Sequence, residues 1–256
     1  MRSLVAFTKK EITEHIRSSK LTILGLIFLL IGVMNPAIAK LTPWFFEIFA
    51  DALAESGVTV TEVTVTAMDS WVQFFKNIPI ALIAFVLIES SIFTKEYSTG
   101  TLILSLTKGL ARYKVVFAKA FTLNALWTLG FWLTFAITYS YNAFYWDNSV
   151  AKSLGFSLFA WWLFGLLVIA LLTLLSTALS SGSTVLFGLG GVVLVSYIIG
   201  LIPKVGKFAP TYLTDGNSLI YGVLEAKSYL PAVVVAIVII ITSYAVSVLA
   251  FNKKQL

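Results

Sequence analysis

Cysteine is absent from the 256-residue sequence, and charged residues make up only 12% of it. Without cysteine the chain can form no disulfide and offers no thiolate to a metal or redox centre. A soluble domain of this length carries about 25% charged residues, whereas 59% of this chain is hydrophobic. Its apolar runs are long and unbroken, unlike the short alternating segments of a membrane β-barrel. The composition therefore predicts an all-α integral membrane protein.

Other missing features narrow the chemistry. The single histidine, His15, lies in a charged N-terminal stretch with no second ligand near it, which favours an interfacial side chain over a metal ligand. No Gly-x-x-x-x-Gly-Lys-Ser/Thr loop is present, so the chain does not bind ATP in that way. There is no His-Glu-x-x-His motif and no pair of aspartates within an apolar run, which argues against an intramembrane enzyme.

Six apolar segments are long enough to cross a bilayer, which takes about 20 residues at 1.5 Å per residue. We expect Asn35-Pro36 to kink or end the first of them, because proline removes a backbone hydrogen bond. The glycines at 188–191 permit close helix approach or provide a flexible point. The chain is thus predicted to be one transmembrane domain, residues 1–256, with spans at about 21–39, 72–93, 115–139, 157–180, 184–202 and 232–251.

Lysine and arginine are distributed unevenly about these spans. An even number of spans places both termini on one side, and that side holds 12 of the 18 basic residues. The positive-inside rule then makes both termini cytoplasmic. Because the basic residues flank spans, the net charge of +6 indicates topology and not nucleic-acid binding.

The first 20 residues are too polar to span. Val5, Thr8, Ile12 and Ile16 recur at helical spacing, with most charged residues on other faces. This pattern predicts a cytoplasmic amphipathic helix in the membrane interface, and the alternative is a basic tail that only enforces topology.

Two linking segments carry structure signals. Residues 94–114 predict a short cytoplasmic helix, capped by Ser98 or Thr99 and ended by Gly109 in a left-handed conformation. The alternative is an ordinary amphipathic loop. Residues 204–230, with prolines and a short amphipathic pattern, predict either a short external helix or a plain surface loop.

The stretch "KEYSTGTLILSLTKGLARYKVVFAKA" resembles the cytoplasmic segment of ABC-2-type transporter permeases, including bacterial peptide and drug exporters of the phenol-soluble-modulin exporter type. Their pattern runs from an acid through Gly-Thr-Leu to an arginine and a later lysine. The matching residues are Glu96, Gly100, Thr101, Leu102, Arg112 and Lys119. The likeness extends to the whole arrangement of one interfacial helix, six spans and a structured external segment.

This resemblance implies the transmembrane domain of a type V exporter in a bacterial plasma membrane. Two such chains, as a homodimer, would meet in the bilayer and dock on two copies of an ATP-binding subunit. ATP and magnesium would then bind the partner, and no cofactor or metal would bind this chain. The residues expected to couple to the ATPase are Glu96, Tyr97, Gly100, Thr101, Leu102 and Arg112.

Two residues are candidates for the translocation path. Glu89 lies inside the second span, where an acid is costly unless it is turned inward or paired. Glu89 could attract cationic cargo at the inner mouth of the path. Alternatively, it could be a structural partner of Lys119 or of a hydroxyl, or it could remain hydrated near the interface. Phe85, with other aromatics, could line an apolar cavity or pack in the core.

The few polar groups in the spans favour an exporter of amphipathic or hydrophobic cargo, with an amphipathic or antimicrobial peptide as first choice and a drug or lipid next. The alternative is an ATP-independent secondary transporter or channel, which would carry more intramembrane ionisable residues.

Overall fold

The structure is a computed structural model that describes residues 2–50, 63–107 and 109–254. This part of the chain is helical and contains no strand. Short 3-10 turns connect some of the helices. The α-helices are α1 (Arg2–Arg17), α2 (Lys20–Ile48), α4 (Ala67–Glu89), α5 (Thr94–Thr99), α6 (Thr101–Thr107), α7 (Arg112–Tyr145), α8 (Leu154–Ala178), α9 (Gly182–Gly200), α10 (Gly216–Ile220) and α11 (Leu230–Lys253).

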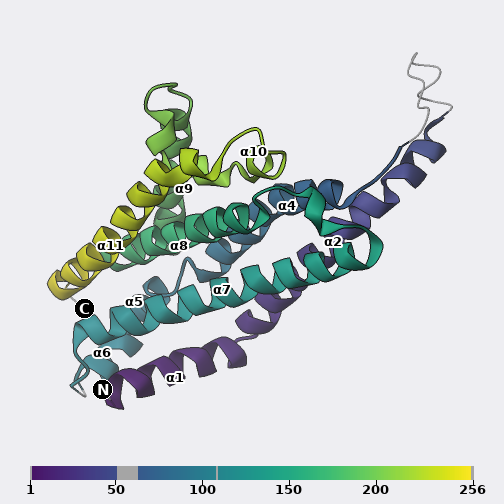
Figure 1. The fold of residues 1–256 in the computed structure, drawn as a ribbon. Coiled ribbons are helices and arrows are strands. Elements are labelled where there is room, and N and C mark those ends of the chain that lie inside the picture. The colour runs from purple at the N-terminus through teal and green to yellow at the C-terminus, as the bar shows by residue number, and fades with distance from the viewer. Residues whose placement is uncertain (1, 51–62, 108, 255–256) are drawn as a thin grey trace.

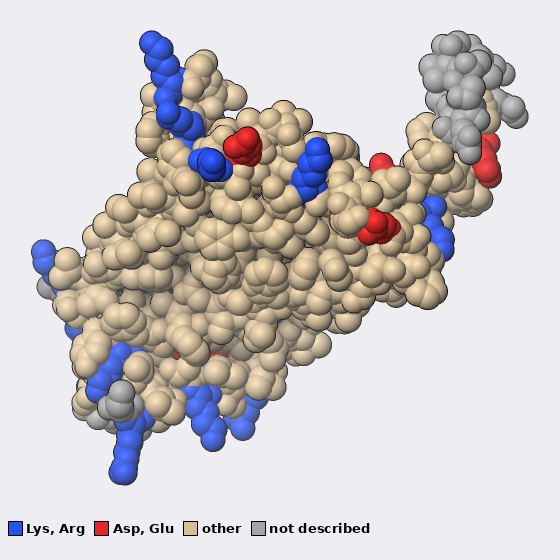
Figure 2. Space-filling view, viewed as in Figure 1, with Lys and Arg blue, Asp and Glu red and all other residues tan. Residues whose placement is uncertain are grey.

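Six of these helical segments are long and apolar enough to cross a membrane, and each overlaps one predicted span. The predicted all-α membrane fold with six spans is therefore confirmed. Even the shortest, α9, has 19 residues, or about 28 Å at 1.5 Å per residue. In Figure 1 the two chain ends lie close together beside α1, α5 and α6, and we call this the terminal end. In Figure 2 a broad belt almost free of charged side chains separates the terminal end, where Lys and Arg gather, from the opposite end.

Helices α2 and α7 extend well beyond the predicted apolar runs, and α4 begins earlier than predicted, whereas α9 has the predicted length. Thr66 starts α4 before the predicted residue 72 by accepting a hydrogen bond from the Met68 N–H, while Asp69 accepts one from the Thr66 N–H. Such a reciprocal capping box satisfies backbone donors that the helix leaves unpaired. Hydropathy alone cannot detect these polar ends.

The prediction that Pro36 ends or kinks the first span there is wrong about the ending, since α2 continues through Pro36 to Ile48. Proline lacks an N–H, so the carbonyl of Gly32, four residues earlier, loses its usual partner. The hydroxyl of Thr138 in α7 donates to this carbonyl at 3.0 Å. A neighbouring helix thus replaces the missing hydrogen bond, which is how membrane helices tolerate proline.

A buried polar chain joins α2, α4 and α7. The Asn77 amide donates to the Asn35 side-chain oxygen at 2.9 Å, and the Asn35 amide donates to the Thr138 hydroxyl at 3.1 Å. A polar group left unpaired in an apolar interior costs a few kcal/mol. These bonds therefore fix the relative register of the three helices.

Aromatic side chains fill the space between α2, α7 and α8. Trp127 of α7 packs edge-on against Phe28 of α2, with ring centroids 5.9 Å apart. Two glycines make room for this packing, because an added Cβ would lie 2.3 Å from Phe28 at Gly130 and 2.1 Å from Trp127 at Gly165. Both positions therefore exclude any larger residue unless the aromatic rings move.

Residues 204–230 form a folded segment. Three 3-10 turns (Gly206–Phe208, Pro210–Thr214 and Ala226–Tyr229) and α10 follow one another here. The Trp161 indole of α8 donates to the Thr214 carbonyl, and the Tyr229 hydroxyl donates to the Asp215 carbonyl, each at 2.8 Å. The sequence left open whether this segment forms a short helix or a plain loop. The structure contains a short helix, held by contacts near the starts of α8 and α11.

Helix α9 packs on its neighbours far less than the other spans do. Only Val185 and Leu189 are buried along it. The predicted close approach at residues 188–191 is found at Gly188, which faces Leu175 of α8, while Gly190 and Gly191 have open space around them. Most of α9 is thus free to face lipid or another chain.

Candidate functional site

The segment between α4 and α7 forms two short helices, α5 and α6, where one had been predicted. Gly100 separates them with φ of 66°, and Gly109 follows α6 with φ of 85°, the left-handed conformation predicted for it. The predicted capping by Ser98 or Thr99 is wrong, since both hydroxyls donate to the Lys95 carbonyl within α5 at 2.9 Å. Glycine adopts a left-handed backbone without steric cost. Gly100 therefore ends α5 and allows α6 to begin as a separate helix.

Glu96 connects this segment to two other helices. It lies in the first turn of α5 and is only 6% exposed. Its carboxylate pairs with Lys10 of α1 and, at 3.0 Å, with Lys119 of α7, whose ammonium group also lies 2.8 Å from Glu11 of α1. Lys119 is 1% exposed. A buried lysine between two carboxylates therefore joins α1, α5 and α7.

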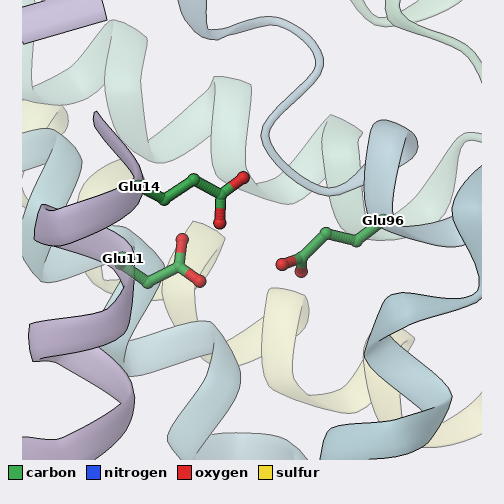
Figure 3. Close-up of side chains that lie close together, drawn as sticks. All are labelled: Glu11, Glu14 and Glu96. Atoms are coloured by element: carbon green, nitrogen blue, oxygen red, sulfur yellow. The ribbon is translucent and has the colours of Figure 1, made fainter. Parts of the chain in front are cut away.

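Three carboxylates converge at this point. Ligand oxygens of Glu11, Glu14 and Glu96 all lie within 4.8 Å of one another, in the arrangement that Figure 3 shows. The ammonium groups of Lys10 and Lys119 already lie among them, with Lys10 3.0 Å from Glu11 and 2.9 Å from Glu14. The two lysines supply the positive charge that a metal ion would bring, so the cluster is an ion-pair network.

Next to it lies a second group around Glu89, the last residue of α4. Its Oε2 is 3.1 Å from the His15 Nε2 and 3.1 Å from the Lys20 ammonium group. Glu89 is fully buried, and its Oε1 has no partner among the described residues. His15 is buried as well, which corrects the expectation of an interfacial side chain. The partners of Glu89 are thus His15 and Lys20, and Lys119 pairs elsewhere.

Together these side chains form what we call the charged network: Lys10, Glu11, Glu14, His15, Lys20, Glu89, Glu96 and Lys119. It contains four carboxylates and three lysines. Burial acts to lower the pKa of His15, but the hydrogen bond to Glu89, the negative charge of Glu89 and the hydrogen bond to the Glu11 carbonyl together leave that pKa raised. With His15 protonated the positive and negative charges balance, which is what a low-dielectric site requires.

Charges on α1 respond to the same surroundings. Burial acts to lower the pKa of Lys10, yet its contacts with Glu96 and Glu11 leave that pKa raised. Burial acts to raise the pKa of Glu14, yet Lys10 lowers it overall. Both groups therefore stay ionised near neutral pH, and the ion pairs persist over that range.

A second connection, the C-terminal clamp, consists of Tyr97, Arg112, Phe251 and Lys254. The Arg112 guanidinium donates to the carbonyls of Phe251 and Lys254 at 2.7 Å. The Lys254 ammonium group donates to the carbonyl of Leu179 at 2.8 Å and lies 4.1 Å from the centre of the Tyr97 ring. Cations at the carbonyl ends of helices are favourable, so the clamp ties α5 and α7 to the ends of α8 and α11.

The residues predicted to couple to an ATPase lie within one region. Glu96 belongs to the charged network, and Tyr97 and Arg112 belong to the clamp. Gly100 and exposed Thr101 form the junction of α5 and α6, and Leu102 is buried. Their contact with a partner protein stays a prediction.

Phe85 is fully buried against Trp127, with ring centroids 6.0 Å apart. It does not line the grooves described below, and a role for Phe85 or Glu89 in translocation stays a prediction. Glu11 and Lys254 had not been singled out from the sequence. Phe7, Glu11 and His15 recur every fourth residue and form the buried face of α1, a spacing that could have identified Glu11.

The model of one protein family, described as ABC-2 family transporter protein, matches residues 5–256. The chain belongs to this family. The six membrane-length helices of the ABC-2 chain fit the membrane component of an ABC transporter, which is not itself an enzyme. A comparison with curated proteins gave no match.

Proposed function

We propose that this ABC-2 chain is the permease subunit of an ATP-driven exporter. Two copies would form a homodimer in a bacterial plasma membrane, and two ATP-binding subunits would dock beneath it. Substrate would move outward by alternating access, driven by ATP hydrolysis on the partner chains. Both termini would be cytoplasmic, in keeping with the gathering of Lys and Arg at the terminal end (Figure 2).

The observation that carries this proposal is the construction of α5 and α6. They lie between two membrane helices, at the end where the basic residues gather, and expose Thr99, Thr101 and Ile103. Ion pairs fix α5 to α1 and α7 through Glu96. A partner that pushes on this exposed surface would therefore move several helices together and would not merely bend a loop.

The C-terminal clamp extends this connection to the other half of the chain. Tyr97 stacks on Phe251 of α11, with ring centroids 6.4 Å apart and planes at 25°. Lys254 in turn binds the carbonyl end of α8. Displacement of α5 would reach α8 and α11 through these contacts, which rest on packed rings and charged hydrogen bonds.

Two apolar grooves support an amphipathic or hydrophobic cargo. One, of about 350 Å³, lies between α4, α8 and α9 and includes Leu82, Val86, Trp161 and Gly190. The other, of about 310 Å³, lies between α8, α9 and α11. Hydrocarbon side chains dominate both, so they suit the apolar face of a peptide, a drug or a lipid better than a hydrophilic solute.

A secondary transporter or channel is the alternative. Proton- or ion-coupled carriers place ionisable groups near the middle of the membrane. In the described part of this chain all buried acidic, lysine and histidine side chains belong to the charged network at the terminal end: Glu11, His15, Glu89, Glu96 and Lys119. This placement favours a mechanical role over ion coupling.

The test is purification of the tagged chain from its native cells, which should recover a phosphate-loop ATPase in a stable complex. In proteoliposomes, Glu96→Gln should separate ATP hydrolysis from export of an amphipathic peptide. Lys95→Gln is the matched control, because Lys95 is the exposed neighbour of Glu96 and has no ion pair among the described residues. Normal export by Glu96→Gln, or transport by the chain alone, would refute the proposal.

A further inference from the structure

Helix α1 has an exposed apolar face beside its buried one. Phe7, Glu11 and His15 turn toward the protein, while Val5 is 67% exposed and Ile16 is 56% exposed. Ile12, at 43% exposure, continues the same row. Such a row is unfavourable in water, so something apolar is expected to cover it.

This row forms one wall of a groove of about 720 Å³, and α7 forms the other. Phe117 and Phe121 of α7 are 53% and 62% exposed. They extend the apolar surface from the terminal end toward the membrane belt. The groove is lined by Leu4, Val5, Thr8, Lys9, Ile12, Thr13, Ile16, Phe117, Ala118 and Phe121.

A row of basic side chains borders the groove. Lys9 lines it and also lines an adjacent polar groove of about 620 Å³, which includes Arg17 and Lys95. Within the residues that the structure describes, none of these three cations forms a salt bridge, whereas their neighbour Lys10 is paired with three carboxylates. The polar groove also includes Lys10 and Glu14, which pair with each other, so the three unpaired cations leave this surface with a net positive charge.

We propose that the groove between α1 and α7 binds an anionic phospholipid. One acyl chain lies along Val5, Ile12 and Phe121, and the phosphate lies near Lys9 and Arg17. Anionic lipids attract basic residues next to an amphipathic helix, while the acyl chain buries the apolar face. A zwitterionic lipid has no net negative charge for the basic residues, and a soluble anion has no acyl chain for the apolar groove. An anionic phospholipid has both. The proposal does not depend on what the transporter moves.

The test uses the purified, delipidated full chain in detergent, titrated with dioleoyl phosphatidylglycerol or dioleoyl phosphatidylcholine and followed by native mass spectrometry. We expect phosphatidylglycerol to bind more tightly, and the double variant Lys9→Gln/Arg17→Gln to weaken it about tenfold while phosphatidylcholine is little changed. Lys204→Gln/Lys207→Gln is the matched control, because these exposed lysines lie on the connection after α9.

Two further experiments test the apolar part of the site separately from its basic part. Ile12→Ser should weaken both lipids, and circular dichroism would show whether this variant keeps its helix content. Soluble glycerol phosphate should not displace bound phosphatidylglycerol. Equal binding of the two lipids, no effect of Lys9→Gln/Arg17→Gln, or full displacement by glycerol phosphate would each overturn the proposal. Loss of ATPase docking with unchanged lipid binding would assign the basic row to a protein partner and would also overturn it.

Discussion

Replacing Lys119 by methionine would remove the ammonium group that lies between Glu11 and Glu96. The side chain is 1% exposed, and the two distances are 2.8 and 3.0 Å. Loss of one partner of a buried ion pair typically costs about 3–5 kcal/mol, because the remaining charge has no compensation. Lys10 still contacts both carboxylates and is partly exposed. We therefore expect Lys119→Met to lower the free energy of unfolding by about 3 kcal/mol, the lower end of that range.

A double-mutant cycle with Glu96→Gln isolates the Lys119–Glu96 contact. Glu96→Gln alone should cost about 1.5–3 kcal/mol, as expected for a charged hydrogen bond. In Lys119→Met/Glu96→Gln one carboxylate fewer is left unpaired, so the double variant should be more stable than the sum by about 1–3 kcal/mol. The measurement is equilibrium unfolding in mixed micelles, with Lys95→Gln as the control.

Additive effects within about 0.5 kcal/mol would mean that Lys119 and Glu96 do not interact directly. An unchanged stability of Lys119→Met would go further. It would show that water reaches this lysine, and the reasoning from a buried network would fail.

Three other predictions follow from single features. Because the pKa of His15 is raised in the folded protein, protonated His15 stabilises the fold fully below about pH 6.5. This stabilisation is lost as the pH rises through the raised pKa. The melting temperature, measured against pH, should show this loss in the wild type and not in His15→Gln. Gly165→Ala should destabilise the fold by about 1–3 kcal/mol, because its Cβ would lie 2.1 Å from Trp127, and equilibrium unfolding measures this. Lys254→Gln should cost about 1–3 kcal/mol, because a charged donor to the end of α8 is lost, and should reduce export per ATP hydrolysed.

Matched variants make these predictions sharper. Gly155→Ala, where nothing lies within 4 Å of the added Cβ, is the control for Gly165→Ala. Lys253→Gln changes the same charge one residue earlier at an exposed position and should preserve coupling. A His15→Gln protein that keeps the wild-type pH profile would assign the titration to another group.

The sequence predicts the spans well because their signal is local. Every predicted run falls inside or overlaps a long helix, and hydropathy alone identifies it. The ends are less predictable, since they depend on single polar contacts such as the Thr66 cap and on partners such as Thr138, which lets α2 pass through Pro36. These contacts join residues far apart in the chain, so no local pattern reveals them.

The candidate site was only partly visible for the same reason. Glu96 and Gly100 stand out in a short motif, and helix-ending rules predicted the left-handed Gly109 but not the helix break at Gly100. His15 and Glu89 are 74 residues apart, and each alone reads as an isolated polar group. Only the packing of α1 against α7 and α2, which brings His15 to the end of α4, shows that the two form a pair.

The charged network also constrains how the protein is made. Glu11 meets Lys119 across 108 residues of sequence. At a synthesis rate of about 5–20 residues per second, the ribosome needs roughly 5 to 20 seconds to deliver that lysine after the glutamate has emerged. During this interval α1 has to wait at the membrane surface with its acids hydrated. Assembly of the amino-terminal helix is therefore a late event, which follows insertion of the third span.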